Sequence, residues 1–189
     1  MPARRILVPL GVVGLAFLLF FWRGCADREV VSLPSDVTAC ASNLREIYQG
    51  LIRYTLREQH PPRESGVAFL GALIASGALE DSATSRARLT CPGPGADPVP
   101  KGVDYGQLAE LTGADSAYAA RDMEAFPLAK FPSGGSELEP IAACDNGLQL
   151  NHDGCMNVLY SDGSVVTLSL AQEIERGRLP AGAKTIPVG

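Results

Sequence analysis

The segment of residues 151–168 constrains the fold most, because it sets an Asp-Gly pair between two apolar runs. Asp162 and Gly163 in this setting predict a β-hairpin, since glycine adopts the positive φ of the turn without steric cost. His152 stands ten residues ahead of Asp162, at the open end of the predicted hairpin. Any chemistry proposed for these polar residues must therefore agree with the geometry of a turn.

Two registers of the hairpin are possible. A loop of Asp162 and Gly163 alone gives two faces of similar apolarity, whereas a loop that also includes Ser161, with Gly163 left-handed, gives one apolar and one mixed face. We favour the second register, because a sheet packed on a helix needs one apolar face. Its apolar face consists of Met156, Val158, Tyr160, Val166 and Leu168.

An amphipathic helix is predicted from Ser35, a candidate N-cap, to just before His60. Its apolar stripe recurs at steps of three and four residues, and Asp36 lies in the first turn, where a negative charge is favourable. The stripe comprises Val37, Cys40, Leu44, Ile47, Leu51 and Tyr54. Further elements are a helix at 66–79, a loop at 89–101, an undecided strand or helical turn at 104–111, a loop at 131–139, a strand at 141–144 and a helix at 170–178.

The N-terminus contains 17 uncharged residues, 6–22, between Arg5 and Arg23. As a helix they would span about 25 Å, near the lower limit for crossing a bilayer. The preceding basic residues place the N-terminus in the cytoplasm and the remainder outside. A cleaved signal peptide is the alternative, and acylation of Cys25 is disfavoured by Arg23.

These patterns predict an α+β fold: an N-terminal transmembrane helix, then a domain in which an amphipathic helix packs on a small antiparallel sheet that ends in a β-hairpin. The expected boundaries are a membrane anchor at 1–23, a hinge at 24–34, an extracytoplasmic domain at 35–180 and a flexible tail at 181–189. The expected location is the inner (cytoplasmic) membrane, as a single-pass protein.

The predicted outer domain is acidic. Without the three basic residues of the first 23, 13 Lys and Arg remain against 21 Asp and Glu, a net charge of about −8 (13 − 21). This charge opposes binding to nucleic acid, and it is scattered singly, as on a solvated surface.

Cysteines in an oxidising compartment suggest disulfides. Of the three pairings that four cysteines allow, we favour Cys40 with Cys91 and Cys144 with Cys155; four reduced, buried thiols are the alternative. The spacing of the cysteines contains no Cys-x-x-Cys pair and gives no indication of zinc.

The sequence also gives little sign of catalysis. An extended strand between His152 and Asp162 would separate them by more than about 13 Å, so they cannot form an acid/base dyad. We expect Asp162 to bond its own turn, Gly163 to hold a positive φ, and His152 to be structural, bonding a loop carbonyl or capping the last helix. No nucleophile motif or phosphate loop is present, so we do not expect an enzyme.

The His-x9-Asp-Gly spacing resembles the C-terminal motif of prepilin-like bacterial proteins related to type II secretion pseudopilins. Residues 40–55, CASNLREIYQGLIRYT, resemble that family's Cys-x-x-Asn-Leu segment, and the Cys91-Pro92 pair and the segment 140–145 follow in the family's order. One departure is clear: the N-terminus lacks the Gly-Phe-Thr-Leu-x-Glu site of prepilin peptidase. This absence speaks against entry into a filament.

The resemblance implies a pilin-like domain with a structural or assembly role and protein partners in a secretion or envelope assembly. Secretion pseudopilins often bind calcium near this end, and Asp145, Asn146, Asn151, His152 and Asp153 supply polar donors, although an EF-hand spacing is absent. No other cofactor is expected. An anchored module that binds an envelope ligand or protein partner is the second hypothesis, and a hydrolase with His152 as base is the third.

Overall fold

The computed structural model describes residues 33–96, 101–128, 131–132, 138–144, 150–184 and 186. All of them except Leu33 belong to one compact unit, Pro34–Gly189. The predicted membrane anchor, most of the hinge, Cys25 and part of the predicted tail lie outside the described residues. Within the described ranges, no helix combines the length and apolarity needed to cross a bilayer.

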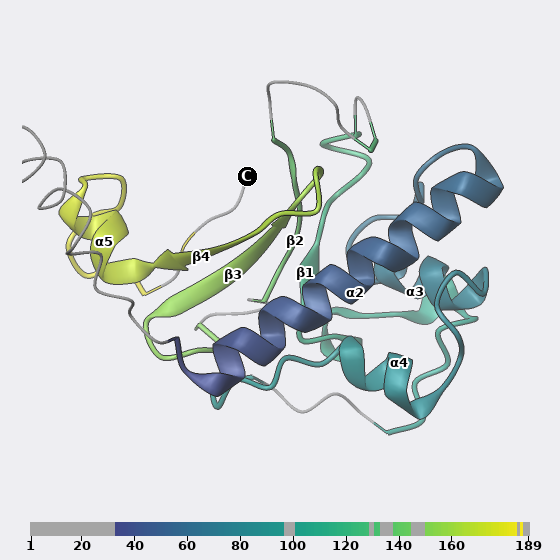
Figure 1. Cartoon of the computed structure of the whole chain (residues 1–189), viewed down its shortest axis with the longest axis horizontal. Coiled ribbons are helices and arrows are strands. Elements are labelled where there is room, and N and C mark those ends of the chain that lie inside the picture. Colours follow the sequence, from purple (N-terminus) through teal and green to yellow (C-terminus); the bar gives the residue numbers. More distant parts are fainter. Residues whose placement is uncertain are drawn as a thin grey trace, which may run out of the picture. The chain divides into compact units, whose positions relative to one another are not determined.

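A four-stranded antiparallel sheet forms one layer of the fold (Figure 1). The strands lie side by side in chain order: β1 (Ala119–Ala120), β2 (Pro140–Ala143), β3 (Cys155–Tyr160) and β4 (Val165–Ser169). Together with the helices, this sheet makes the fold α+β, as the sequence predicts. The short strand β1 has no counterpart among the predicted elements, because two alanines carry no strand pattern.

The β3–β4 hairpin has the register with the loop of three residues. Leu159 pairs with Val165, the Gly163 amide donates to the Tyr160 carbonyl over 2.9 Å, and Gly163 has φ +85°. Asp162 Oδ1 accepts from the Ser164 amide at 2.8 Å, which closes the turn from its side chain. The turn chemistry of three consecutive residues therefore sets the register.

The long helix α2 (Ser35–Glu58) packs on this sheet, and its predicted apolar stripe is buried. Pro34 occupies the N-cap position without a side-chain bond, so the predicted capping by Ser35 is not observed. The helix ends at Gln59, which adopts a left-handed φ of 63°, and the prolines at 61 and 62 then prevent its continuation.

Shorter helices complete the domain. The predicted second helix is α3 (Val67–Ala75), which is buried along nearly its whole length, and the predicted terminal helix is α5 (Leu170–Glu175). The undecided segment forms a 3-10 turn, Leu108–Glu110, followed by another, Gly113–Asp115. Helix α4 (Ala83–Arg88) has no counterpart among the predicted elements, because its sequence is polar; Ser82 caps it by accepting from the Ser85 amide.

Helix α2 contacts the mixed face of the hairpin and not the apolar face, which differs from the prediction. Asn157, from the mixed face, contacts α2 by donating from Nδ2 to the Val37 carbonyl at 2.8 Å. Met156 and Val158, on the opposite face of β3, are 1% and 0% exposed, while Val166 is 40% exposed. Strand β3 is thus buried on both faces. The apolar or mixed character of a face therefore does not show which of the two the helix covers.

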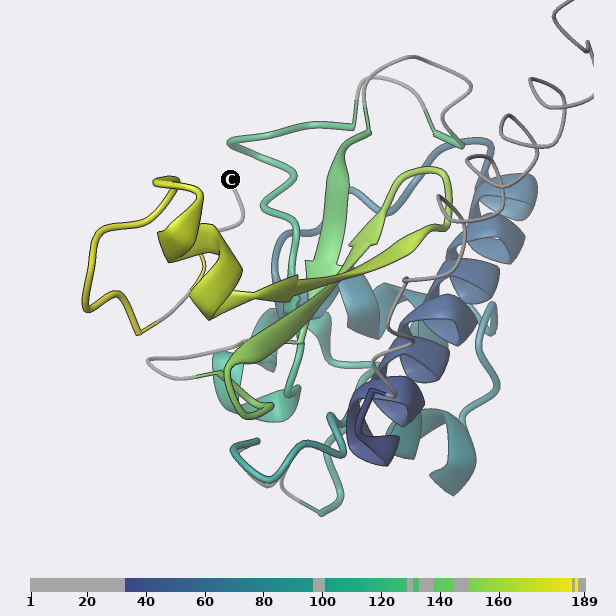
Figure 2. The ribbon, with the colours of Figure 1, turned by 60° about the vertical axis from the view of Figure 1, so that its left-hand side comes forward.

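Helix α2 runs along the hairpin, from its open end to its turn (Figure 2). Val37, in the first turn of the helix, contacts β3 near the open end, and Tyr48 lies over the turn. A Cβ placed on Gly163 would come within 2.5 Å of Tyr48 Cε1. Gly163 is therefore required twice, for its positive φ and for the close approach of the tyrosine ring.

We predict that Gly163→Ala lowers the free energy of unfolding by about 2–4 kcal/mol, because a positive φ and an overpacked contact add together. The matched control is Gly154→Ala, which has a similar φ of +68° but no atom within 4 Å of the added Cβ, and should lose only about 1–2 kcal/mol. Urea unfolding measures both variants. Equal losses would show that the contact with Tyr48 is unimportant.

Candidate metal centre

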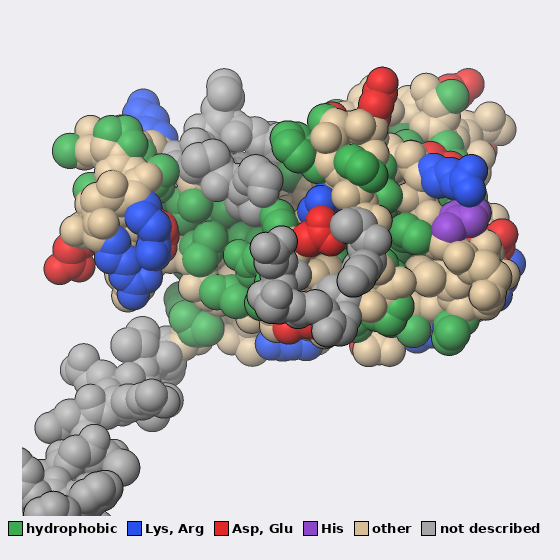
Figure 3. Space-filling view, turned by 90° about the horizontal axis from the view of Figure 1, so that it is seen from above, with side chains coloured by type: hydrophobic (Ala, Val, Ile, Leu, Met, Phe, Trp, Pro, Cys, Tyr) green, Lys and Arg blue, Asp and Glu red, His purple; other side chains and the backbone are tan. Residues whose placement is uncertain are grey.

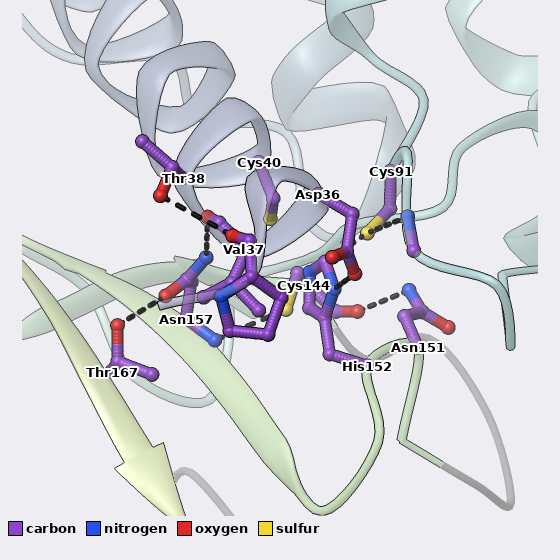
Figure 4. Close-up of polar contacts among 12 residues, drawn as sticks. Asp36, Val37, Thr38, Cys40, Cys91, Cys144, Asn151, His152, Asn157 and Thr167 are labelled. Atoms are coloured by element: carbon purple, nitrogen blue, oxygen red, sulfur yellow. Dashed lines mark hydrogen bonds and ion pairs between the residues drawn. The ribbon is translucent and has the colours of Figure 1, made fainter. Parts of the chain in front are cut away.

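Four metal-binding side chains converge beside the first turns of α2. They are Cys40, Cys91, Cys144 and His152, whose donor atoms all lie within 4.8 Å of one another. All four are buried, with Cys91 the most exposed at 7%. Figure 4 shows the three sulfur atoms and the imidazole between α2, the loop that contains Cys91, the end of β2 and the segment before β3.

The imidazole of His152 is fixed from both sides. Its Nδ1 lies 2.7 Å from Asp36 Oδ2, and its Nε2 lies 3.3 Å from Cys91 Sγ. The His152 side chain is 0% exposed, whereas Asp36 is 27% exposed at the start of α2. Asp36 therefore orients the ring so that Nε2 faces the thiols.

Cys144 is placed by the pairing of β2 with β3. The Cys144 amide donates to the Asn157 carbonyl at 3.0 Å, and the Asn157 amide donates to Cys144 Sγ at 3.1 Å. The Asn151 side chain donates to the Cys144 carbonyl and to the Ala117 carbonyl. Backbone and side-chain bonds thus hold this cysteine directly after its strand.

The predicted disulfides differ from what the structure contains. Cys40, Cys91, Cys144 and Cys155 are all free thiols. The strand register places Cys144 opposite Asn157 and pairs Cys155 with Ser169, so Cys144 joins Cys40 and Cys91 instead of Cys155. The prediction rests on the short connection between the two strands and does not include their register.

Cys91 lies on a loop that packs closely against the segment 150–152. The Gly93 amide donates to Cys91 Sγ at 3.4 Å, and the Gly95 amide donates to the Asn151 carbonyl at 3.0 Å. A Cβ on Gly93 would lie 2.1 Å from the Asn151 oxygen and 2.8 Å from His152 Nδ1. Glycine at position 93 is therefore needed for the loop to reach the histidine.

The proton affinities of the cluster reflect its close packing. Burial disfavours the charged imidazole, but hydrogen bonds to Cys40, Cys91 and Asp36 outweigh this effect and raise the pKa of His152 to about 11. Hydrogen bonds from Cys144 and Cys91 lower the pKa of Cys40, while the hydrogen bond to Cys40 raises the pKa of Cys144. The lowered pKa of Cys40 and the raised pKa of His152 favour the charged forms of these two side chains.

The other predicted site residues lie apart from this cluster or outside the described residues. Asp162 and Gly163 close the turn of the hairpin. Asp162 bonds the Ser164 amide and His152 bonds Asp36, as expected for two residues that do not form a dyad. His152 bonds a carboxylate rather than the expected loop carbonyl or helix end. Among the calcium candidates, Asp145 and Asn146 are not described, Asp153 is exposed, and the Asn151 amide is bonded to backbone carbonyls.

Three thiols and one imidazole form a soft donor set, which is typical of zinc and other thiophilic metals rather than calcium. Two cavities of the described part of the chain are lined by other residues than these four: one by residues 119–122, 126 and 140–143, the other by residues 65–68, 111–113 and 119–120. The chain matches no known protein family, and no curated protein or solved structure matches it significantly.

Asn157 is a further residue of this region that the sequence analysis does not single out. It is 0% exposed; its Nδ2 donates to the Val37 carbonyl, and its Oδ1 accepts from Thr167 Oγ1 at 2.7 Å. An asparagine inside an apolar strand pattern is the available signal, because a buried amide needs partners on neighbouring elements.

We predict that Asn157→Ala lowers the free energy of unfolding by about 2–4 kcal/mol, because it removes one buried and one partly buried hydrogen bond and leaves a cavity. The matched control is Asn43→Ala on α2, where one partly buried bond of 3.2 Å to the Thr90 carbonyl is lost, at a cost of about 0.5–1.5 kcal/mol. Thermal and urea unfolding compare the two. A smaller loss for Asn157→Ala than for Asn43→Ala would contradict this assignment.

Proposed function

We propose that this protein is a membrane-anchored, extracytoplasmic structural or assembly protein, related in design to type II secretion pseudopilins. The observation that supports it best is the architecture of α2 on the sheet: a helix of 24 residues, following the apolar N-terminal segment, lies along a C-terminal Asp-Gly hairpin. The anchor confines the domain to the membrane surface. Weak contacts with partners there gain from a high effective concentration.

The outward face of α2 is the surface we propose for partner contacts. It presents small, polar, basic and apolar side chains along the length of the helix, and its apolar end is Leu56, which is 71% exposed. A leucine exposed to this degree gains free energy when a partner covers it. The exposed positions include Thr38, Ala39, Ser42, Arg45, Gln49, Arg53 and Leu56.

The alternative of an anchored binding module has weaker support. Among the cavities lined by described residues, the two named above measure about 220 and 250 Å³. Pockets for small ligands are usually about 300–1,000 Å³. Figure 3 shows charged side chains of both signs on one face, with Lys and Arg side chains gathered at its left end next to an acidic one.

The hydrolase hypothesis requires a nucleophile near His152, and Cys91 Sγ lies 3.3 Å from its Nε2. Geometry alone would therefore permit a cysteine nucleophile with a histidine base. A substrate would also need access, but Cys91 is only 7% exposed and His152 only 1%. This burial favours a structural use of the cluster.

The membrane location and orientation are testable in cells that express the full chain. We expect the protein to remain in the pellet after alkaline carbonate extraction, because residues 6–22 would be held by the bilayer. External protease should digest the domain in spheroplasts with an intact inner membrane. Release by carbonate, or protection from protease until lysis, would refute the anchored, outward arrangement.

Partner contact through α2 is testable by cross-linking in intact cells. We expect Leu56→Glu to reduce the yield of cross-linked complexes by about 10- to 100-fold, because a buried leucine contributes about 1.5–3 kcal/mol to an interface. Leu138→Glu is the matched control, since Leu138 is also exposed, at 48%, but precedes β2. Complexes that are lost equally in both variants, or in neither, would exclude the outward face of α2.

A further inference from the structure

The donor atoms of the cluster lie nearly as close together as the four ligands of one metal ion. Zinc bonds of about 2.3 Å to sulfur and 2.0–2.1 Å to nitrogen place neighbouring ligand atoms about 3.6–3.8 Å apart. The four donor atoms lie within 4.8 Å of one another, and the distance from Cys91 Sγ to His152 Nε2 is 3.3 Å. A central ion would need only small side-chain adjustments.

The surroundings of the donors match those of a metal centre. Asp36 binds His152 at Nδ1, so the ring presents Nε2 to the thiols, which is the usual carboxylate–histidine–metal arrangement. The amides of Gly93 and Asn157 donate to the sulfurs of Cys91 and Cys144. These bonds stabilise the thiolates that a metal requires.

The burial of the cluster also needs an explanation. Metal binding deprotonates the thiols, and three thiolates buried side by side repel one another at a high cost unless a cation lies between them. A divalent cation at their centre neutralises two of the three thiolate charges, and the amides of Gly93 and Asn157 stabilise the charge that remains on sulfur. The donor set, its outer partners and its burial thus point to the same occupant.

We propose that Cys40, Cys91, Cys144 and His152 bind one zinc ion in a closed, structural site. Zinc suits three thiolates and one imidazole, and four protein ligands leave no open position for a substrate or a reactive water. On binding, the ion displaces the thiol protons to solvent. The site joins the start of α2, the Cys91 loop, the end of β2 and the open end of the hairpin.

The test is the metal content of the full chain, purified in detergent without chelators and measured by mass spectrometry of the elements. We expect about one zinc per chain in the wild type and less than about a tenth of that in Cys91→Ser, because a lost ligand opens the tetrahedron. Cys155→Ser is the matched control and should keep its zinc, since Cys155 is not among the four converging residues. Equal zinc in Cys91→Ser and the wild type would overturn the proposal.

A spectroscopic measurement on the wild type covers the case in which Cys91→Ser does not fold. Cobalt(II) exchanged into the protein should give the intense visible bands of a tetrahedral ion and a thiolate-to-cobalt charge-transfer band, with Asp36→Asn binding cobalt about 10-fold or more weakly. Octahedral spectra would overturn the proposal. So would a freshly isolated protein free of metal and linked by a Cys40–Cys91 disulfide, as read from its unreduced and reduced masses.

Discussion

The position of α2 depends on polar contacts between its first turn and the open end of the β3–β4 hairpin. The Asp36 carboxylate bonds His152, and the Val37 carbonyl bonds Asn157, over 2.7 and 2.8 Å. The hydrophobic effect has no direction, so apolar burial alone specifies the register of a helix on a sheet less sharply than polar contacts do. Hydrogen bonds between buried groups fix one register, since every other register leaves them without partners.

Sequence reasoning is most successful where local chemistry decides. The Asp-Gly turn, with Ser161 included, predicts the register of the hairpin, and the repeat of apolar residues predicts α2 and its buried face. Both patterns are strong because apolar residues recur at one regular spacing along the whole segment, every second residue in a strand and every three or four residues in a helix. Elements without such a period are missed, among them β1 and α4.

The cluster of donors could not be predicted in the same way. Zinc-site rules rely on ligands that lie close together in sequence, but here Cys144 and His152, eight positions apart (152 − 144), are the nearest pair. The cluster exists only because α2, the Cys91 loop and β2 pack around the segment before β3. Asn157 and Gly93 are further examples, since their roles depend on atoms from distant segments.

The span of these contacts along the chain has a consequence for how the molecule reaches its native state. The bonds from His152 to Asp36 and from Asn157 to Val37 join residues 116 and 120 positions apart. During synthesis, α2 emerges early, and its apolar stripe has no sheet to cover it until the hairpin has followed. Closure of such long loops is slow because the chain loses entropy before the contacts form. Helix α2 is thus made early but fully buried late, and the newly made chain depends on the hairpin near its C-terminus to cover the apolar stripe of α2.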